Sequence, residues 1–351
     1  MKKLLMTAVA VGLASSASAA LTQNWFIAAE DSTVNASALI ANDTANQNNE
    51  RGFAYNPTTG NLLVASKRGG AGKITKVAAA TGVVGTTLNN GGSGFITGGG
   101  GGVLTEIAVT TDGVIYACSL ATSAANFKIY RWADENATPT VAFGPSASPQ
   151  ITARTGDSFA LTGTGVNTII YASGSGNAVV EVFTTADGLS FTPGTDIAVP
   201  AAGDARSGIA VRTDNGNLLI KVAAGSLKEI TTAGAVVGTG SGTTVGTTGP
   251  IGFYTNGSKS LVATQSGTLT PAFGRAWDIT GGVSAAANNT PESDTPGMGS
   301  TANGNGSGEA AFAVIGGQLR MFVLSTNNGI GSYGNNTEFG VSSAVNDWTA
   351  Y

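Results

Sequence analysis

A hairpin-like motif recurs six times along this chain, with a spacing of about 50 residues between most copies. Each copy alternates small and apolar residues, passes through a turn rich in glycine or asparagine, and returns as an apolar run. The copies begin at Arg51, Thr105, Asp157, Ser207, Ile251 and Ala310. Because Asn-Gly and Asp-Gly pairs adopt positive φ readily, each copy predicts a β-hairpin.

The first five hairpins are followed by a third short apolar segment, such as FKIYRW or LKEITT, and then by a weaker fourth one. Four short strands per repeat are typical of one blade of a β-propeller. We therefore expect an all-β fold, a single β-propeller domain over residues 20–351. Six blades are favoured. A seventh would have to lie between residues 285 and 308, a Gly-, Asn- and Ser-rich stretch that is better explained as a surface loop.

The segment NWFIAAED, residues 24–31, reads as a strand without a hairpin of its own. We expect it to pair beside the last repeat, so that the N-terminal and C-terminal strands close the ring. Two other all-β folds fit less well. An outer-membrane barrel needs strands of about 9–11 alternating residues, whereas the strands predicted here are shorter, and a β-helix has shorter repeats than these.

The composition agrees with this fold and excludes several chemistries. The chain has 52 glycines and only 11% charged residues, which favours short strands and tight turns. It has no histidine, which excludes a Ser-His-Asp triad and histidine-bound zinc, and one cysteine, Cys118, which excludes an intramolecular disulfide. The net charge of −4 with no basic stripe argues against a nucleic-acid partner.

The first residues predict export. Lys2 and Lys3 precede an apolar run that ends in the small residues ASA. This pattern is typical of a signal peptide, here residues 1–19, and the apolar run is too short to span a membrane. We expect a secreted protein, located in the periplasm, on the cell surface or outside the cell, with no membrane span after the signal is removed.

Three segments carry a resemblance to a known family: RGFAYNPTTGNLLVAS, DGVIYACSL and FKIYRWADE. Together they resemble a family of secreted bacterial proteins catalogued only as a domain of unknown function. The resemblance is good over residues 51–222 and weak elsewhere. It implies an exported, propeller-like protein and brings no catalytic residues.

The charged residues that begin the inner strands are the best candidates for a binding site. Equivalent strands of a propeller begin at one mouth of the central channel, so we expect these side chains to surround it. The candidates are Glu50, Arg51, Glu106, Asp157, Arg206 and Glu309. Their mixed signs suit a polar ligand with hydroxyl groups, or a zwitterion, better than a polyanion. The alternative is that they cap the blades and satisfy loop amides.

Nothing in the sequence predicts catalysis, a metal or a cofactor. The Gly-rich runs lack the Gly-Lys-Ser/Thr ending of a phosphate-binding loop, and each acidic turn offers too few carboxylates for calcium. We therefore expect a non-catalytic binding or structural module, with a polar small molecule, a glycan or a surface protein as its partner. The second hypothesis is a carboxylate-dependent glycan hydrolase or lyase that uses the same face.

Overall fold

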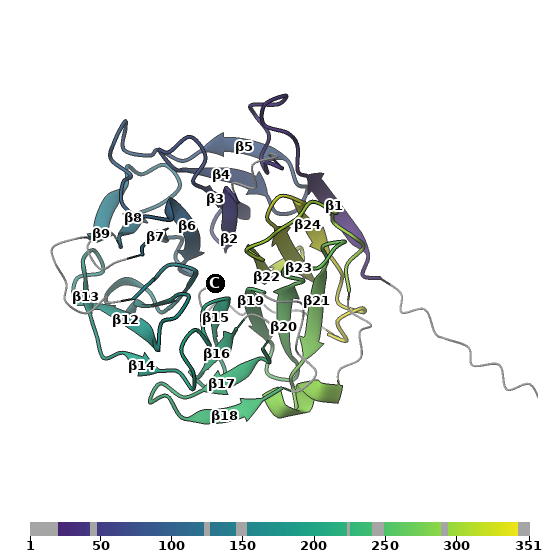
Figure 1. Cartoon of the computed structure of the whole chain (residues 1–351). Coiled ribbons are helices and arrows are strands. Elements are labelled where there is room, and N and C mark those ends of the chain that lie inside the picture. Colours follow the sequence, from purple (N-terminus) through teal and green to yellow (C-terminus); the bar gives the residue numbers. More distant parts are fainter. Residues whose placement is uncertain are drawn as a thin grey trace, which may run out of the picture.

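The computed structural model describes residues 20–42, 48–122, 127–144, 153–222, 225–240, 249–288 and 294–342. The predicted signal peptide lies outside these residues. Six small antiparallel sheets stand around a central axis, which is the arrangement of a six-bladed β-propeller (Figure 1). The predicted fold class and blade number are confirmed.

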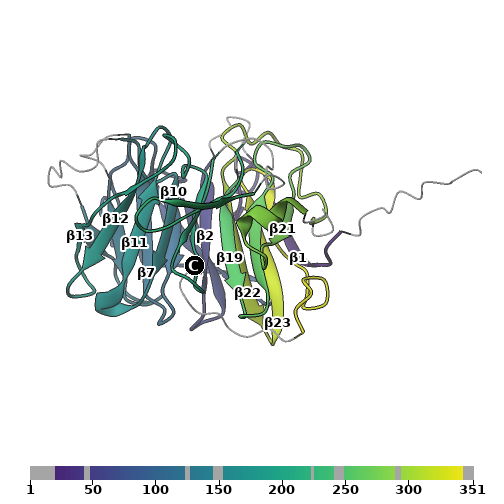
Figure 2. The same ribbon diagram turned by 90° about the horizontal axis from the view of Figure 1, so that it is seen from below.

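Each blade begins with an inner strand beside the axis and continues outward through consecutive strands (Figures 1 and 2). The first blade comprises β2 (Glu50–Asn56), β3 (Asn61–Ser66), β4 (Lys73–Ala78) and β5 (Val84–Thr87). The second comprises β6 (Gly102–Val109), β7 (Ile115–Leu120), β8 (Ile129–Trp132) and β9 (Thr140–Phe143). The third comprises β10 (Ser158–Thr162), β11 (Ile169–Ser173), β12 (Val179–Thr185) and β13 (Phe191–Pro193), with β14 (Ile197–Ala198) also paired to β12.

The remaining blades follow the same order. The fourth comprises β15 (Gly208–Val211), β16 (Leu218–Lys221), β17 (Lys228–Ile230) and β18 (Val236–Thr239). The fifth has three strands among the described residues, β19 (Ile251–Thr255), β20 (Ser260–Gln265) and β21 (Gly274–Asp278). The sixth comprises β22 (Gly308–Ile315), β23 (Gln318–Ser325), β24 (Gly329–Tyr333) and β1 (Gln23–Ala28).

The turn between the first and second strand of every blade contains a glycine with positive φ. These glycines are Gly60, Gly113, Gly163, Gly216, Gly257 and Gly316, with φ between 58° and 87°. An L side chain rarely adopts this conformation, so the glycine lets the chain reverse without strain. The repeated turn chemistry in the sequence therefore marks real hairpins.

The hydrophobic core is divided among the six contacts between neighbouring blades. Each buried cluster joins residues of two adjacent blades: Phe322 of the sixth blade packs with Phe53 of the first, and Trp132 of the second blade packs with Leu63 of the first. A further cluster joins the fifth and sixth blades through Tyr254 and Phe312. Because every blade buries apolar surface against both neighbours, the ring is stabilised as a whole.

The strand β1 completes the sixth blade, as the sequence predicts. It pairs antiparallel with β24, with Phe26 opposite Gly331. The indole of Trp25 packs 6.0 Å from the ring of Phe322, and its Nε1 donates a hydrogen bond of 2.8 Å to the carbonyl of Ala79 in the first blade. The N-terminal strand thus joins the last blade and also contacts the first.

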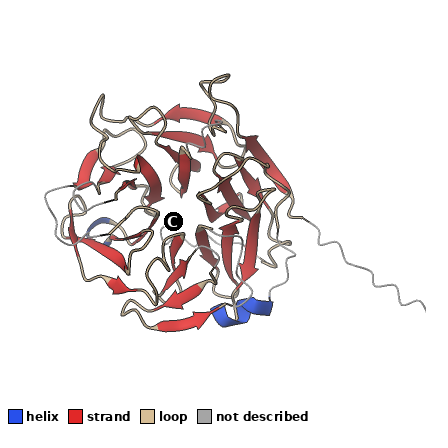
Figure 3. Ribbon diagram, in the orientation of Figure 1, coloured by secondary structure: helices blue, strands red, loops and turns tan. Residues whose placement is uncertain are grey.

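The fifth blade differs from the four-strand pattern expected of the first five repeats. Its outermost described strand, β21, pairs regularly with β20 on its inner side. On its outer side no further strand follows among the described residues, and an isolated bridge places Arg275 opposite Asp294. The described helical elements are two short 3₁₀ helices, Gly165–Asn167 and Val283–Asn288, both at the periphery (Figure 3). Part of the predicted loop at residues 285–308 therefore covers the edge of the fifth blade.

One buried carboxyl group connects the first two blades. Glu135, which follows β8 and is 7% exposed, accepts hydrogen bonds of 2.9 Å from the amide nitrogens of Asn56 and Asn61. It also accepts one from the hydroxyl of Thr59. These donors belong to the first hairpin turn, so the carboxyl group fixes that turn against the neighbouring blade.

Candidate functional site

A polar cavity lies where the inner strands begin, at one mouth of the central channel. It has a volume of about 230 Å³, and we call it the mouth cavity. Its lining comes from the starts of the inner strands of all six blades and from the loop before β22. The lining residues are Arg51, Glu106, Arg154, Asp157, Ser175, Arg206, Ser207, Pro250, Gly304, Asn305, Gly306, Ser307 and Gly308.

Asp157 is the centre of an ion-pair network in this cavity. Its carboxylate accepts hydrogen bonds of 2.6 and 2.7 Å from Arg154, one of 3.3 Å from Arg51 and one of 2.9 Å from the backbone N–H of Ser175. Burial disfavours the charged form, but the two guanidinium groups and the N–H donor outweigh it and hold the pKa of Asp157 below its usual value. Asp157 is therefore a fixed negative charge that holds two arginines in place.

Glu106 is buried in the wall of the cavity, with 4% of its surface exposed. Its carboxyl group occupies the space that a side chain at Gly52 would fill, because a Cβ there would overlap Oε2. Burial, the nearby Glu309 and, to a smaller extent, Asp157 raise the pKa of Glu106 well above its ordinary value, although Arg51 opposes them. No described residue donates a hydrogen bond to this carboxyl group.

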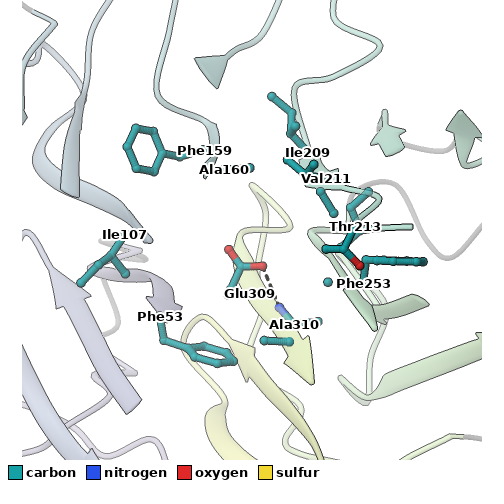
Figure 4. Close-up of a pocket in the computed structure, with 14 residues that line it drawn as sticks. Phe53, Ile107, Phe159, Ala160, Ile209, Val211, Thr213, Phe253, Glu309 and Ala310 are labelled. Carbon is teal, nitrogen blue, oxygen red and sulfur yellow. Dashed lines mark hydrogen bonds between the residues drawn. The ribbon is translucent and has the colours of Figure 1, made fainter. Parts of the chain in front are cut away.

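Glu309 lies one layer deeper in the channel. It lines a small space below the mouth cavity together with Glu106 and Asp157, and also an apolar section of about 40 Å³. In this section its carboxyl group is surrounded by side chains such as Phe53, Ile107 and Phe159, and it accepts a hydrogen bond of 2.9 Å from the N–H of Ala310 (Figure 4). Burial raises the pKa of Glu309 to about 8.

The channel is therefore layered along its axis. The charged mouth cavity is followed by a constriction with Glu106 and Glu309, and then by a section lined mainly by apolar side chains. A charged or hydroxylated molecule finds more polar partners in the mouth cavity than in the mainly apolar section, and burying a polar group without a hydrogen bond costs free energy. The mouth cavity is consequently the candidate site.

The structure brings together most of the residues predicted from the sequence. Arg51, Glu106, Asp157 and Arg206 line the mouth cavity, and Glu309 lies directly below it.

Glu50 is placed elsewhere. Its carboxyl group accepts hydrogen bonds from the N–H of Ala41 (3.0 Å) and the hydroxyl of Ser66 (2.7 Å), and it lies 3.8 Å from Arg68. The pairing register of β2 with β3 shifts at Arg51, and the side chains of Glu50 and Arg51 have separate partners, so only Arg51 lines the mouth cavity.

Sequence reasoning missed the loop residues of the cavity. Arg154 precedes β10 and forms an ion pair with Asp157 three residues later, a spacing that the segment ARTGD contains. Ser307 and the glycines around it come from the loop before β22, within the stretch expected to be a surface loop. Only the closed ring brings this loop to the mouth, and no local pattern signals it.

Several polar atoms in the cavity wall have no partner among the described residues. They are Nε of Arg51, Oγ of Ser207 and Oγ of Ser307, all of them buried. Arg206 also forms no ion pair within the described part of the chain. Buried polar atoms are rarely left unpaired in folded proteins, so these three are the unsatisfied polar atoms of residues that line the cavity.

The described residues contain no cluster of three or more acidic or cysteine side chains arranged to hold a metal ion. Cys118 is fully buried on β7, where burial and the neighbouring Glu106 raise the pKa of its thiol, so it is not a reactive nucleophile.

None of the helices in the described ranges is long and apolar enough to cross a membrane.

Comparison of the sequence with protein-family models and with curated proteins finds no match. Comparison of the structure does find similar folds. The chain is similar to a crystal structure of a DUF4623 family protein from Bacteroides eggerthii, with a TM-score of 0.63 and 14% identity over 83% of this chain and 72% of the other. In all, 575 chains of solved structures match. A likeness of this kind shows the fold alone, because one fold serves many functions. The function has to be argued from the mouth cavity.

Proposed function

We propose that the protein is an exported, non-catalytic binding module that takes a small polar molecule in the mouth cavity. The polar lining of the mouth cavity carries this proposal, because Arg51, Glu106, Arg154, Asp157 and Arg206 surround one space of about 230 Å³. The volume of about 230 Å³ is below the range of roughly 300–1,000 Å³ common for drug-sized ligands, which favours a ligand no larger than a monosaccharide or an amino acid.

Two further observations support the proposal that the protein is exported and belongs to a secreted bacterial family. The signal-peptide pattern of residues 1–19 supports export to the periplasm, the cell surface or the outside of the cell. The resemblance of the three segments to a secreted bacterial family, together with the structural likeness to a DUF4623 protein, supports distant membership of such a family.

A thermal-shift screen of the mature domain tests the proposal. Monosaccharides, hydroxy acids and amino acids are added one at a time, and a ligand that binds the folded state raises the melting temperature. Ser175→Trp should abolish the shift, because Ser175 is exposed on the cavity wall and its side chain makes no hydrogen bond to a described residue. Ser258→Trp is the matched control, since Ser258 is exposed in the β19–β20 turn, far from where the inner strands begin.

The outcomes are clear. A hit that persists in Ser258→Trp and disappears in Ser175→Trp supports the cavity as the site. A screen without any hit would leave a purely structural propeller, and hits unaffected by Ser175→Trp would show that binding takes place outside the mouth cavity.

A second candidate function is carboxylate-dependent hydrolysis or cleavage of a glycan. Asp157 and Glu106 share the mouth cavity with pKa values shifted in opposite directions, lowered for Asp157 and raised for Glu106, which is a pattern that acid-base catalysis uses. Release of reducing ends or unsaturated products from a panel of polysaccharides, lost in Glu106→Gln, would favour the enzyme over the binding module.

A further inference from the structure

The mouth cavity carries an excess of positive charge. Three guanidinium groups line it, those of Arg51, Arg154 and Arg206, and Asp157 is the one carboxylate in its lining whose pKa is lowered. Lys67 adds to the same potential from the neighbouring loop. Its pKa is lowered by burial and then by the charges of Arg51 and Arg154, which shows that positive charge is concentrated here.

The two glutamates do not cancel this excess. Glu106 is buried and Glu309 half-buried; the nearby Glu309 adds to the raised pKa of Glu106, and burial raises the pKa of Glu309 itself. Two such carboxyl groups hold at least one proton between them at neutral pH, because both cannot ionise at close range. Three positive charges therefore face one fixed carboxylate and at most one further negative charge.

The uncharged donors of the wall complement this charge. The hydroxyl groups of Ser207 and Ser307 and a carboxyl proton on Glu106 can bond hydroxyl or carboxylate oxygens of a ligand. Arg206 has no ion-pair partner among the described residues, and Nε of Arg51 is unpaired. A guanidinium group binds a carboxylate through parallel hydrogen bonds, and both arginines line the cavity, so the lining suits an oxyanion.

We propose that the ligand of the mouth cavity is a small hydroxylated carboxylate, in the class of uronic acid monosaccharides, held by Arg51 and Arg206 through its carboxylate and by the serines through its hydroxyls. This inference rests on the proposed binding function and names its ligand class. It narrows the sequence-based expectation of a polar ligand with hydroxyl groups or a zwitterion, because three arginines line the cavity and Asp157 pairs with only two of them.

The proposal predicts a pH dependence. The groups that face Glu106 are Arg51 on β2, Asp157 before β10, Glu309 on β22 and the neutral thiol of Cys118 on β7. When the pH rises and the second proton leaves the Glu106–Glu309 pair, a negative charge appears beside the bound carboxylate. Affinity for an acid ligand should therefore fall from pH 5.5 to pH 8.5, and affinity for a neutral sugar should not.

Isothermal titration calorimetry with D-glucuronate, D-glucose and glucose 6-phosphate tests the proposal on the mature domain. We expect glucuronate to bind at least 10-fold more tightly than glucose. Arg206→Ala should weaken glucuronate by about 10- to 100-fold, the usual loss for a charge-assisted hydrogen bond. Arg320→Ala is the matched control, because Arg320 lies on β23 and bonds only the carbonyl of Ala80. Glu106→Gln should reduce the pH dependence without abolishing binding at pH 5.5.

Each outcome decides a separate point. Equal affinity for glucose and glucuronate, or an unchanged affinity in Arg206→Ala, would overturn the carboxylate assignment while the binding function stands. Tightest binding of glucose 6-phosphate would replace the carboxylate by a phosphate dianion. If neither these sugars nor any compound of the thermal-shift screen binds, the proposed function itself fails.

Discussion

Replacement of Glu135 by alanine should destabilise the ring more than any surface change. The substitution removes the acceptor of three hydrogen bonds, from Asn56, Thr59 and Asn61. A hydrogen bond to a charged group contributes about 1.5–3 kcal/mol when buried, and less where water can replace it. The bond from Asn56 is buried and the other two are partly buried, so we expect a total loss of about 3–5 kcal/mol.

Denaturation by guanidinium chloride, followed by tryptophan fluorescence, measures this loss as a change in the free energy of unfolding. Glu135→Gln keeps one acceptor oxygen and should lose about 1–2 kcal/mol. Glu338→Ala is the matched control. Glu338 also accepts three hydrogen bonds, two of 2.9 Å from Thr22 and one of 2.7 Å from Asn335, but its bonds are exposed or only partly buried.

The control should lose less than about 1 kcal/mol, because water replaces the missing oxygen. An equal loss of unfolding free energy in Glu135→Ala and Glu338→Ala would refute the reasoning that burial strengthens the contact between the first two blades.

Three further predictions concern stability. Trp25→Ala should cost about 2–4 kcal/mol, because it removes the hydrogen bond to Ala79 and the packing that holds β1 in the last blade; an unchanged melting temperature would contradict closure by β1. Burial lowers the pKa of Lys221 to about 8, below its unfolded value, so the free energy of unfolding should rise by about 2 kcal/mol between pH 7.5 and 9.5. Lys221→Met should lack that rise in matched denaturation curves. Burial raises the pKa of Glu309 instead, so stability should fall between pH 5 and pH 8 as the folded state loses its extra proton, and Glu309→Gln should flatten this fall.

The sequence was sufficient for the blades because their signals are local. A hairpin needs alternating residues and a turn that accepts positive φ, and Gly60 and Gly216 supply this within a few positions of the strands they join. The position of Trp25 in the last blade could be predicted only by elimination, since the segment had no partner nearby.

Part of the candidate site could be predicted from the sequence for the same reason. Equivalent positions on equivalent strands gave Arg51, Glu106 and Asp157, because the repeat places them at one end of the channel. Ser307 was not predictable, since it comes from a loop whose path depends on the closed ring. The protonation of Glu106 depends on burial against Gly52 and on Glu309, about 200 residues away in the chain, and no pattern in one repeat reveals it.

The pairing of β1 with β24 also affects how the chain folds during its synthesis. Asn24 bonds the carbonyl of Gly334, 310 positions later. At about 5–20 residues per second, synthesis separates the two by roughly 15–60 s. Thus β1 leaves the ribosome long before its partner strand β24 has been made. Until then Trp25, Phe26 and Ile27 have no partner strand to pair with. The ring therefore cannot close before β24 has been made. For the whole of that interval the chain exposes an unpaired apolar strand to any chaperone or to another nascent copy.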